Sequence, residues 1–421
     1  MFKKILSTIS TRVMTTLMSF FIVVLNARYL GAEDLGTISL IVLGITILMN
    51  LNSIVGGGNL VYLIPRYNYH SLLTFSYLWV FAILVIFLVV MQFFNVFSTG
   101  KTYSLHIILL SFVLSFSKVN LNVLISKERI GKVNIINFLQ VFLLFATIIT
   151  GFFLFFRREI EVYIVGLYIS YLTCTVLSFI FFGDHLPKPR FREIKLHLKK
   201  LVSYGFLIQL ANLLQLLNYR VTYYIIDGYF QRSVLGVYSV GIQFAEALWL
   251  ICRSLALVHF SRVSNTNDKP YAIRITLQFA RASFMITILL VILLLCIPSS
   301  IFSSVLGNEF RVVPKIIAYL SISIISNSLT IMLTNYFLAV GKHHLNSVVN
   351  IAGLILTIGV GFILIPRYGY AGAGITTSVS FFTMLVIAFI LFRRLTGTRA
   401  KDLLIRKEDF VLGYQLLRNY F

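Results

Sequence analysis

Long apolar stretches, separated by short polar connections, recur from one end of this 421-residue chain to the other. A helix needs about 20 mostly apolar residues to cross a bilayer. Twelve stretches meet that requirement: 8–28, 38–63, 72–94, 104–126, 134–156, 161–182, 201–226, 235–258, 276–302, 313–338, 345–365 and 371–393. Only 12% of the residues are charged, about half the fraction usual in soluble domains. The sequence therefore predicts an all-α polytopic membrane protein with twelve transmembrane helices and excludes a soluble enzyme.

The basic residues are concentrated in alternate connections between these stretches. The formal net charge is +22, and of the 36 Lys and Arg residues 24 fall on the side that holds both termini, against eight on the other side. Lys and Arg are enriched in cytoplasmic loops of membrane proteins, so we expect both termini in the cytoplasm. Because the basic residues sit in short loops between apolar stretches, they do not indicate nucleic-acid binding.

Two halves of the chain resemble each other. Tyr, Leu, Gly and Ser recur at an offset of 200 between 29–39 and 229–239, and Gly131-Lys132 recurs as Gly341-Lys342. Since each half holds six predicted spans, we expect a parallel repeat of two six-helix bundles around a central cavity that opens to either side in turn. The predicted domains are an N-terminal bundle, a basic cytoplasmic linker, a C-terminal bundle and a basic cytoplasmic tail, over 1–182, 183–200, 201–393 and 394–421.

Several ionised side chains lie within the predicted spans, where charge is costly unless it meets water or a partner. They are Lys118, Arg220, Arg253, Arg281 and Glu246, with Arg12 near the cytoplasmic edge of the first span. The excess of positive charge predicts a pocket for an anionic group such as pyrophosphate, because Arg binds phosphate in a bidentate way and Lys as a point charge. The alternative is that these long side chains reach the nearest membrane surface.

Glu246 has two open roles. It can pair with Arg253, seven residues later on the same helical face, or with Arg281, or it can bind a coupling proton or sodium ion. Trp249 lies three residues after Glu246, on nearly the same face. The sequence shows no metal-ligand spacing and no cofactor motif, so we predict no cofactor, no metal ion and no catalytic residue.

Amide side chains mark a further candidate region. Gln209, Asn212, Arg220 and Tyr223 fall on one broad face of the span 201–226. Amide and phenol groups hydrogen-bond sugars well, so this face predicts sugar binding, with hydrogen bonds between helices as the alternative. Weaker polar features follow elsewhere: a strip at Asn327, Thr330 and Asn335, and the run Gly56-Gly57-Gly58, which predicts a loosened helix beside a cavity.

The segment 26–36, N-A-R-Y-L-G-A-E-D-L-G, resembles the signature after the first span of the Wzx-type O-antigen and polysaccharide flippases. These belong to the multidrug/oligosaccharidyl-lipid/polysaccharide exporter superfamily. The repeat of this segment at 228–240, the turn at 340–342 and the stretch 365–373 fit the same pattern. The resemblance covers essentially the whole chain and rests on the order and spacing of short motifs.

The resemblance implies a function. It implies a multi-pass protein of the bacterial plasma (inner) membrane that moves an undecaprenyl-pyrophosphate-linked oligosaccharide, an O-antigen or capsule repeat unit, from the inner to the outer leaflet. Its implied partners are membrane lipids, a polysaccharide polymerase and a chain-length regulator, and it has no nucleic-acid partner.

Two alternatives belong to other classes. A drug or cation antiporter of the same superfamily would bind cationic substrates, which the positive interior disfavours. A membrane polysaccharide polymerase or ligase would need catalytic groups on a large outer loop, and the predicted outer loops are short. We therefore predict a transporter and no enzymatic activity.

Overall fold

The protein is a bundle of long helices, seen in a computed structural model that describes residues 2–64, 66, 69–94, 97, 99–182 and 191–403. Helices dominate because a polypeptide in hydrocarbon must satisfy its backbone hydrogen bonds within itself. The chain divides into two compact units, one of residues up to Leu213 with 305–307, and one of 214–304 with the residues from 308 onward.

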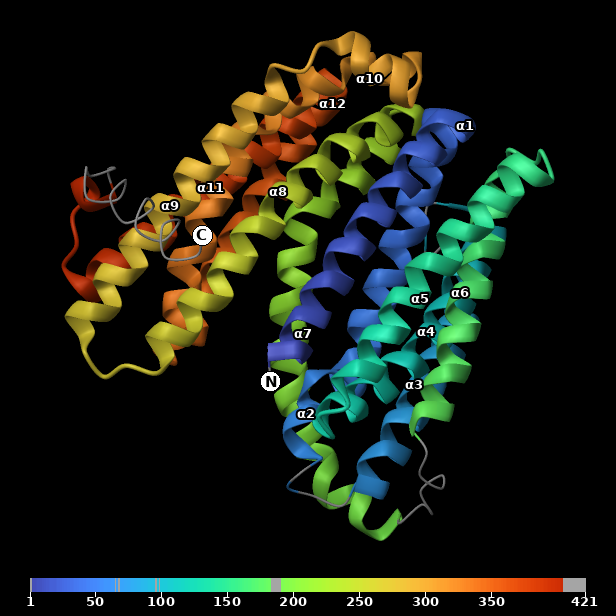
Figure 1. Ribbon diagram of the computed structural model, residues 1–421, viewed down its shortest axis with the longest axis horizontal. Helices are drawn as coiled ribbons and strands as arrows, with labels where there is room; N and C mark the ends of the chain where they lie inside the picture. The colour runs from blue at the N-terminus through green and yellow to red at the C-terminus, as the bar shows by residue number, and fades with distance from the viewer. Residues whose placement is uncertain are drawn as a thin grey trace. The chain divides into compact units, whose positions relative to one another are not determined.

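The first unit, unit 1, is built from the helices of the N-terminal half (Figure 1). They are α1 (Phe2–Gly56), α2 (Gly58–Leu63), α3 (Tyr69–Phe93), α4 (Lys101–Ser126), α5 (Ile130–Ile149), the π-helix η1 (Thr150–Leu154), α6 (Ile160–Phe182) and the first part of α7 (Phe191–Tyr229). Apolar side chains of α1, α4, α5 and α6 form a core cluster, which includes Ile41, Ile107 and Ile148. The four helices thereby bury their apolar faces against each other.

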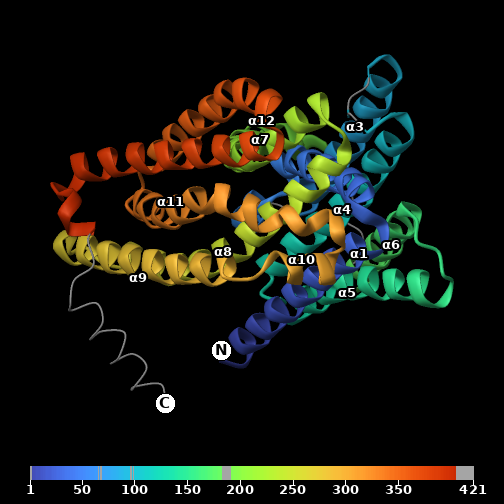
Figure 2. The same ribbon diagram turned by 90° about the horizontal axis from the view of Figure 1, so that it is seen from above.

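The second unit, unit 2, holds the end of α7 and the remaining elements. They are α8 (Arg232–Ser264), α9 (Lys269–Leu295), α10 (Ser299–Leu306) as far as Ser304, the 3₁₀-helix η2 (Asn308–Val312), α11 (Val313–Ala339), α12 (His343–Thr396) and the 3₁₀-helix η3 (Ala400–Leu403). Figure 2 shows α11 between α9 and α12, and α11 also packs along α8. Helix α11 is therefore the central helix of unit 2, with a buried side chain in almost every turn.

Glycines divide α1 and α12 each into two segments. Gly31 has φ 82° and Gly369 has φ 55°, which are left-handed conformations that suit glycine because it has no Cβ. The two segments of α12 then run side by side, since the Thr357 hydroxyl lies 2.7 Å from that of Ser380, which donates to the Gly353 carbonyl. Nine helices among the described residues are long and apolar enough to cross a membrane. With α1 and α12 counted as two segments each, and α7 added, the twelve predicted spans are all helical.

The predicted end of one span is wrong. The stretch 276–302 was expected to be continuous, but α9 ends at Leu295 and a separate short helix begins at Ser299. Pro298 lies between them, and proline lacks the N–H that a continuing helix would need. The repeat motifs lie at corresponding turns, at the α1 break and at the connection from α7 to α8.

The division between the units falls within α7, between Leu213 and Leu214. Of the predicted linker, 191–200 belong to α7, and 183–190 lie outside the described residues. Most of the predicted tail, from 404 onward, also lies outside them. The predicted domain limits and the central cavity between the two bundles stay predictions.

The predicted loosening at the glycine run is confirmed, because α1 ends at Gly56 and α2 starts at Gly58. A broken helix leaves carbonyl groups without their normal partners. Here the Asn59 amide donates to the Ile54 carbonyl and the Asn122 amide donates to that of Gly56, each at 2.9 Å. Side-chain amides thus replace the missing helical hydrogen bonds.

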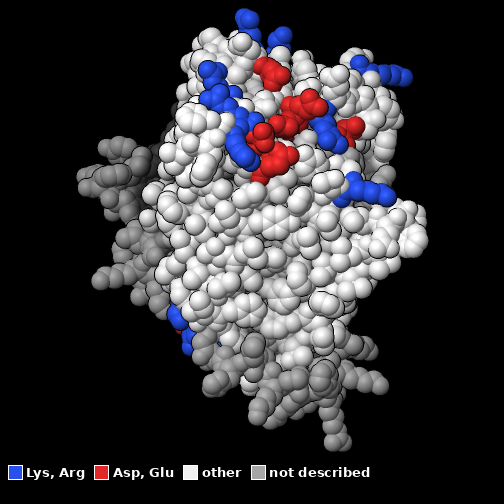
Figure 3. Space-filling view, turned by 90° about the vertical axis from the view of Figure 1, so that its right-hand side faces the viewer, with Lys and Arg blue, Asp and Glu red and all other residues white. Residues whose placement is uncertain are grey.

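Charged residues avoid the middle of the surface that Figure 3 presents. Lys, Arg, Asp and Glu gather at one end of that face, and a broad belt of uncharged side chains follows below them. Large apolar side chains are exposed along the long helices, for example Phe81, Ile86 and Val176. An exposed apolar surface of this extent is stable against lipid tails but not against water. The protein is a multi-pass membrane protein.

Helix α7 passes so close to the α1–α2 break that Gly205 has no room for a side chain. A Cβ there would collide with the Ile54 carbonyl and lie 2.7 Å from the Asn59 amide nitrogen. We expect Gly205→Ala to destabilise the protein by about 1–3 kcal/mol, as overpacking does. The measurement is thermal unfolding in detergent, in which this variant should have a lower unfolding temperature. Gly58→Ala is the matched control, since nothing lies within 4 Å of its Cβ position. Equal unfolding temperatures for the two variants would contradict this packing.

Candidate functional site

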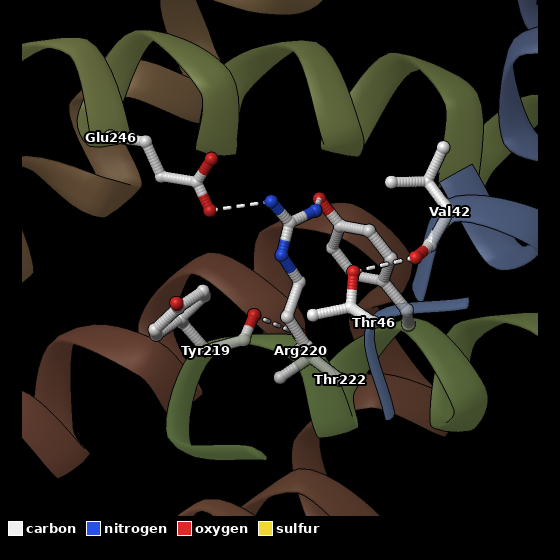
Figure 4. Close-up of polar contacts among 7 residues, drawn as sticks. Val42, Thr46, Tyr219, Arg220, Thr222 and Glu246 are labelled. Carbon is white, nitrogen blue, oxygen red and sulfur yellow. Dashed lines mark hydrogen bonds and ion pairs between the residues drawn. The ribbon is translucent and has the colours of Figure 1, made fainter. Parts of the chain in front are cut away.

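An ion pair joins α7 to α8 inside unit 2 (Figure 4). The Arg220 guanidinium donates to Glu246 through Nη2 at 2.5 Å and to the Tyr223 hydroxyl through Nη1 at 2.6 Å. Its Cζ also lies 4.8 Å from the centre of the Tyr223 ring and 5.6 Å from that of Tyr219. Two charge-assisted hydrogen bonds, one to a carboxylate and one to a phenol hydroxyl, and two aromatic rings therefore hold this guanidinium in one orientation.

Of the two roles that the sequence left open for Glu246, the structure shows the ion pair, but the partner is neither Arg253 nor Arg281. Arg253 was expected because it follows Glu246 by seven residues on the same face, yet two turns separate the two by about 10.5 Å along the helix. Arg220 reaches Glu246 from the neighbouring helix instead. The pair is neutral as a whole, so Arg220 contributes no free positive charge while Glu246 holds it.

A cavity of about 360 Å³ lies within unit 2. Four helices line it: α7, α8, α11 and α12, the last with both of its segments. Its polar lining consists of six amide side chains, two threonines, a tyrosine and an arginine: Gln215, Asn218, Asn327, Asn335, Asn346, Asn350, Thr330, Thr334, Tyr219 and Arg253. Apolar residues such as Leu257, Phe381 and Met384 complete the wall. No described residue of the lining is acidic.

Arg253 is the positively charged group of this cavity. Its side chain is exposed, and no described carboxylate forms an ion pair with it. The charge of Arg253 also acts on the Tyr219 hydroxyl, which lines the same cavity. An uncompensated guanidinium beside neutral amides makes the cavity suitable for a ligand with both negative and polar neutral parts.

Two predicted residues lie just behind the cavity wall. Trp249 is fully buried, donates to the Ile324 carbonyl at 3.4 Å, and places its ring 5.9 Å from Tyr219 and 5.4 Å from Phe381. Tyr223 is fully buried as well, beside Tyr238. Both residues therefore support residues of the site and have no surface of their own for a ligand.

Arg281 lies at a different place in unit 2 from the one its prediction implies. Its side chain is buried and its Nη1 donates to the Asp402 carbonyl of η3 at 2.9 Å. Leu403 of the same segment packs against the core cluster that includes Cys252 and Met332. Arg281 thus fastens the segment after α12 to α9.

The remaining predicted residues belong to unit 1. Lys118 is half-buried on α4, and its charge acts on the Cys174 thiol of α6. Arg12 is exposed on α1. Gln209 is buried, close to the break at Gly57, and accepts a hydrogen bond of 3.2 Å from the exposed Asn212. The sugar-binding face predicted on α7 is therefore divided between the two units.

Sequence reasoning missed the amides of α12. Asn346 and Asn350 lie four residues apart, so both fall on one side of the helix, and Asn350 donates to the Asn346 side chain at 3.2 Å. Their signal in the sequence was two amides at helical spacing within an apolar stretch. The strip Asn327, Thr330 and Asn335 is the weaker of the two polar features in the sequence, yet all three of its residues line the cavity.

Comparisons with known proteins place the fold. No protein-family model matches the chain. In solved structures, the lipid II flippase MurJ in an inward closed conformation has a TM-score of 0.73 at 14% identity, over 100% of this chain and 93% of MurJ. An inward-facing multidrug resistance MATE family transporter of the MOP superfamily gives 0.73 at 14% identity, over 93% and 98%. The chain shares this fold, and its twelve-helix, two-bundle class is confirmed.

One curated relative is also similar in sequence. The capsular polysaccharide biosynthesis protein CapF of Staphylococcus aureus is 22% identical over 216 residues, which are 49% of this chain and 54% of CapF. The match thus spans about half the length of the curated relative. It links the chain to a protein named for polysaccharide biosynthesis.

The Arg220–Glu246 pair is open to a double-mutant test. Either single change, Arg220→Ala or Glu246→Ala, leaves a partly buried charge without its partner, so we expect each to cost about 1–3 kcal/mol. The double variant should recover part of that loss, with a coupling energy of about 0.5–3 kcal/mol. Thermal unfolding in detergent measures it, and additive losses would contradict the pairing. The Arg232–Asp227 pair has a longer contact of 3.4 Å between its charged atoms. It is the comparison and should show a smaller coupling energy, because strong charged hydrogen bonds are short.

Proposed function

We propose that this protein is a transporter that moves an undecaprenyl-pyrophosphate-linked oligosaccharide, an O-antigen or capsule repeat unit, from the inner to the outer leaflet. The observation that carries the proposal is the cavity of unit 2, where the unpaired Arg253 guanidinium shares a wall with six amides. A pyrophosphate attached to sugars offers the matching groups, which are anionic oxygens followed by hydroxyls. The MurJ-like fold and the similarity to CapF support the same substrate class.

Each charged residue has a separate task in this proposal. Arg253 binds a phosphate oxygen, and Arg220 provides a second cation when the ligand's negative charge competes with Glu246 for it. Glu246 keeps Arg220 neutralised in the empty protein, which lowers the cost of holding that cation away from water. Lys118 is the candidate cation of unit 1, while Arg12 and Arg281 are weaker candidates because one is exposed and the other is bonded to η3.

The setting of the proposed transport is the bacterial inner membrane, with both termini in the cytoplasm and the protein alternating between inward-open and outward-open states. The lipid tail would stay in the bilayer while the headgroup crosses. Glu246 is also the candidate for proton or sodium coupling, in which case the coupling ion would displace Arg220 from it. A polysaccharide polymerase and a chain-length regulator are the proposed partners downstream.

Reconstituted vesicles test this proposal. We expect the purified protein to speed up the movement of a fluorescent undecaprenyl-pyrophosphate oligosaccharide between leaflets, measured by quenching of the outer leaflet. Arg253→Ala should slow that movement about tenfold or more, since a hydrogen bond to a charged group contributes about 1.5–3 kcal/mol. Arg262→Ala, an exposed arginine near the end of the same helix, should leave the rate unchanged. Vesicles with wild-type protein that move the lipid no faster than empty vesicles would disprove the function.

A drug or cation antiporter is the second candidate, favoured by the structural likeness to MATE transporters. A cationic drug would need a free carboxylate, and Glu246 is held by Arg220. Efflux of a cationic dye by cells that express the protein, lost in Glu246→Gln, would favour this candidate over the flippase.

A further inference from the structure

The amides of the unit 2 cavity fall into two groups. Asn218 donates to the Leu214 and Asn350 carbonyls, Asn350 donates to the Asn346 carbonyl and side chain, and Asn335 donates to the Ile331 carbonyl. These bonds fix the helices that form the cavity. Their donor capacity is largely used within the protein.

The second group is free. Asn327 is only 6% exposed and lines the cavity, and its side-chain amide forms no hydrogen bond with any described residue. Gln215 is also without a hydrogen-bond partner among the described residues and lines the same cavity from α7. A buried amide left without partners has lost its bonds to water and gained none in return, which is unfavourable. Such a residue at a cavity wall is therefore available to a ligand that supplies both donors and acceptors.

The size and the lining of the cavity limit what that ligand can be. At about 360 Å³ the cavity lies at the small end of the range of roughly 300–1,000 Å³ for ligand pockets. That volume is too small for an oligosaccharide. The lining combines amides with the apolar side chains of Phe381, Met384 and Val349, as suits a sugar ring, which has polar edges and apolar C–H faces. Arg253 adds one cation to the same wall.

We propose that this cavity binds a glycosyl phosphate, with the sugar ring between the free amides of Asn327 and Gln215 and its phosphate on Arg253. The inference rests on the proposed function and makes it more specific. In a lipid-linked oligosaccharide, only the first sugar is attached directly to the pyrophosphate. The C-terminal bundle therefore recognises that first sugar, and the rest of the glycan stays outside the cavity. This explains how one transporter accepts a headgroup much larger than its pocket.

The protein contains its own reporter for the test. Trp249 contacts both Tyr219 and Phe381, which line the cavity, and Trp79, the other of the two tryptophans, can be replaced by Phe. Full-length protein with this change, in lipid nanodiscs, is titrated with N-acetylglucosamine 1-phosphate, N-acetylglucosamine, glucose 1-phosphate and inorganic phosphate, each at constant osmolality. We expect a saturable change of Trp249 fluorescence, with a sugar phosphate bound more tightly than either free sugar or phosphate.

Variants separate the two halves of the ligand. Arg253→Ala should weaken sugar-phosphate binding about tenfold and leave free-sugar binding unchanged. Asn327→Ala should weaken sugar and sugar phosphate about three- to tenfold and leave inorganic phosphate unchanged. Gln215→Ala should weaken the same ligands as Asn327→Ala does. Because Gln215 is exposed, a loss of binding in this variant cannot be explained by a folding defect of a buried substitution. Asn265→Ala, an exposed amide at the end of α8, is the control and should bind as the parent does.

Either of two results would overturn the inference. One is no saturable signal with any sugar phosphate. The other is equal affinity for sugar phosphate and inorganic phosphate, with neither affinity changed by Asn327→Ala or Gln215→Ala. The vesicle assay keeps this failure apart from that of the proposed function. A protein that moves the lipid-linked oligosaccharide but binds no sugar phosphate retains the function and loses this site. A protein that binds sugar phosphate but moves no lipid retains the site and loses the function.

Discussion

Hydrocarbon offers no hydrogen bonds, and the whole structure depends on that constraint. Each backbone group must find its partner within the protein, so the chain is almost entirely helical in its described parts. Where a helix breaks at Gly57, the Asn59 and Asn122 amides take up the freed carbonyls. Where two ionised groups lie at membrane depth, Arg220 and Glu246 neutralise each other. A polar side chain without such a partner is therefore an exception that needs a physical reason.

The cavity of unit 2 holds such exceptions. Its wall holds the unpaired guanidinium of Arg253 and the free amide of Asn327, which are of little use for packing. Apart from Gln215, the other amides around it are engaged in hydrogen bonds between α7 and α12 or within one helix. The protein thus maintains a polar hollow between helices that would pack more stably with apolar residues. A ligand that carries both charge and hydroxyl groups accounts for this arrangement.

Hydropathy and glycine positions were enough to predict most of the fold. All twelve spans are helical, and the glycine run at 56–58 breaks the helix as expected. The end of α9 was missed because an apolar window ignores Pro298. The site was harder to predict than the fold, because hydropathy does not determine how each helix is rotated about its axis relative to its neighbours. That rotation decides that Glu246 meets Arg220 and not Arg253, and that Asn346 and Asn350 face the cavity. Arg281 also donates to a backbone carbonyl in η3, a bond that no sequence pattern reveals.

Water and ligand access to the cavity is best measured with a single cysteine at Thr334, which lines the cavity. Its hydroxyl donates to the Thr330 and Ile331 carbonyls of its own helix. Cys174, Cys252 and Cys296 are first replaced by Ala, and membranes are treated with a small, charged methanethiosulfonate reagent. If the cavity is a hydrated binding site, Thr334→Cys reacts, and N-acetylglucosamine 1-phosphate slows the reaction while inorganic phosphate at the same concentration does so less. A cysteine there that reacts only with lipid-soluble maleimides, or at a rate that no sugar phosphate changes, would contradict it.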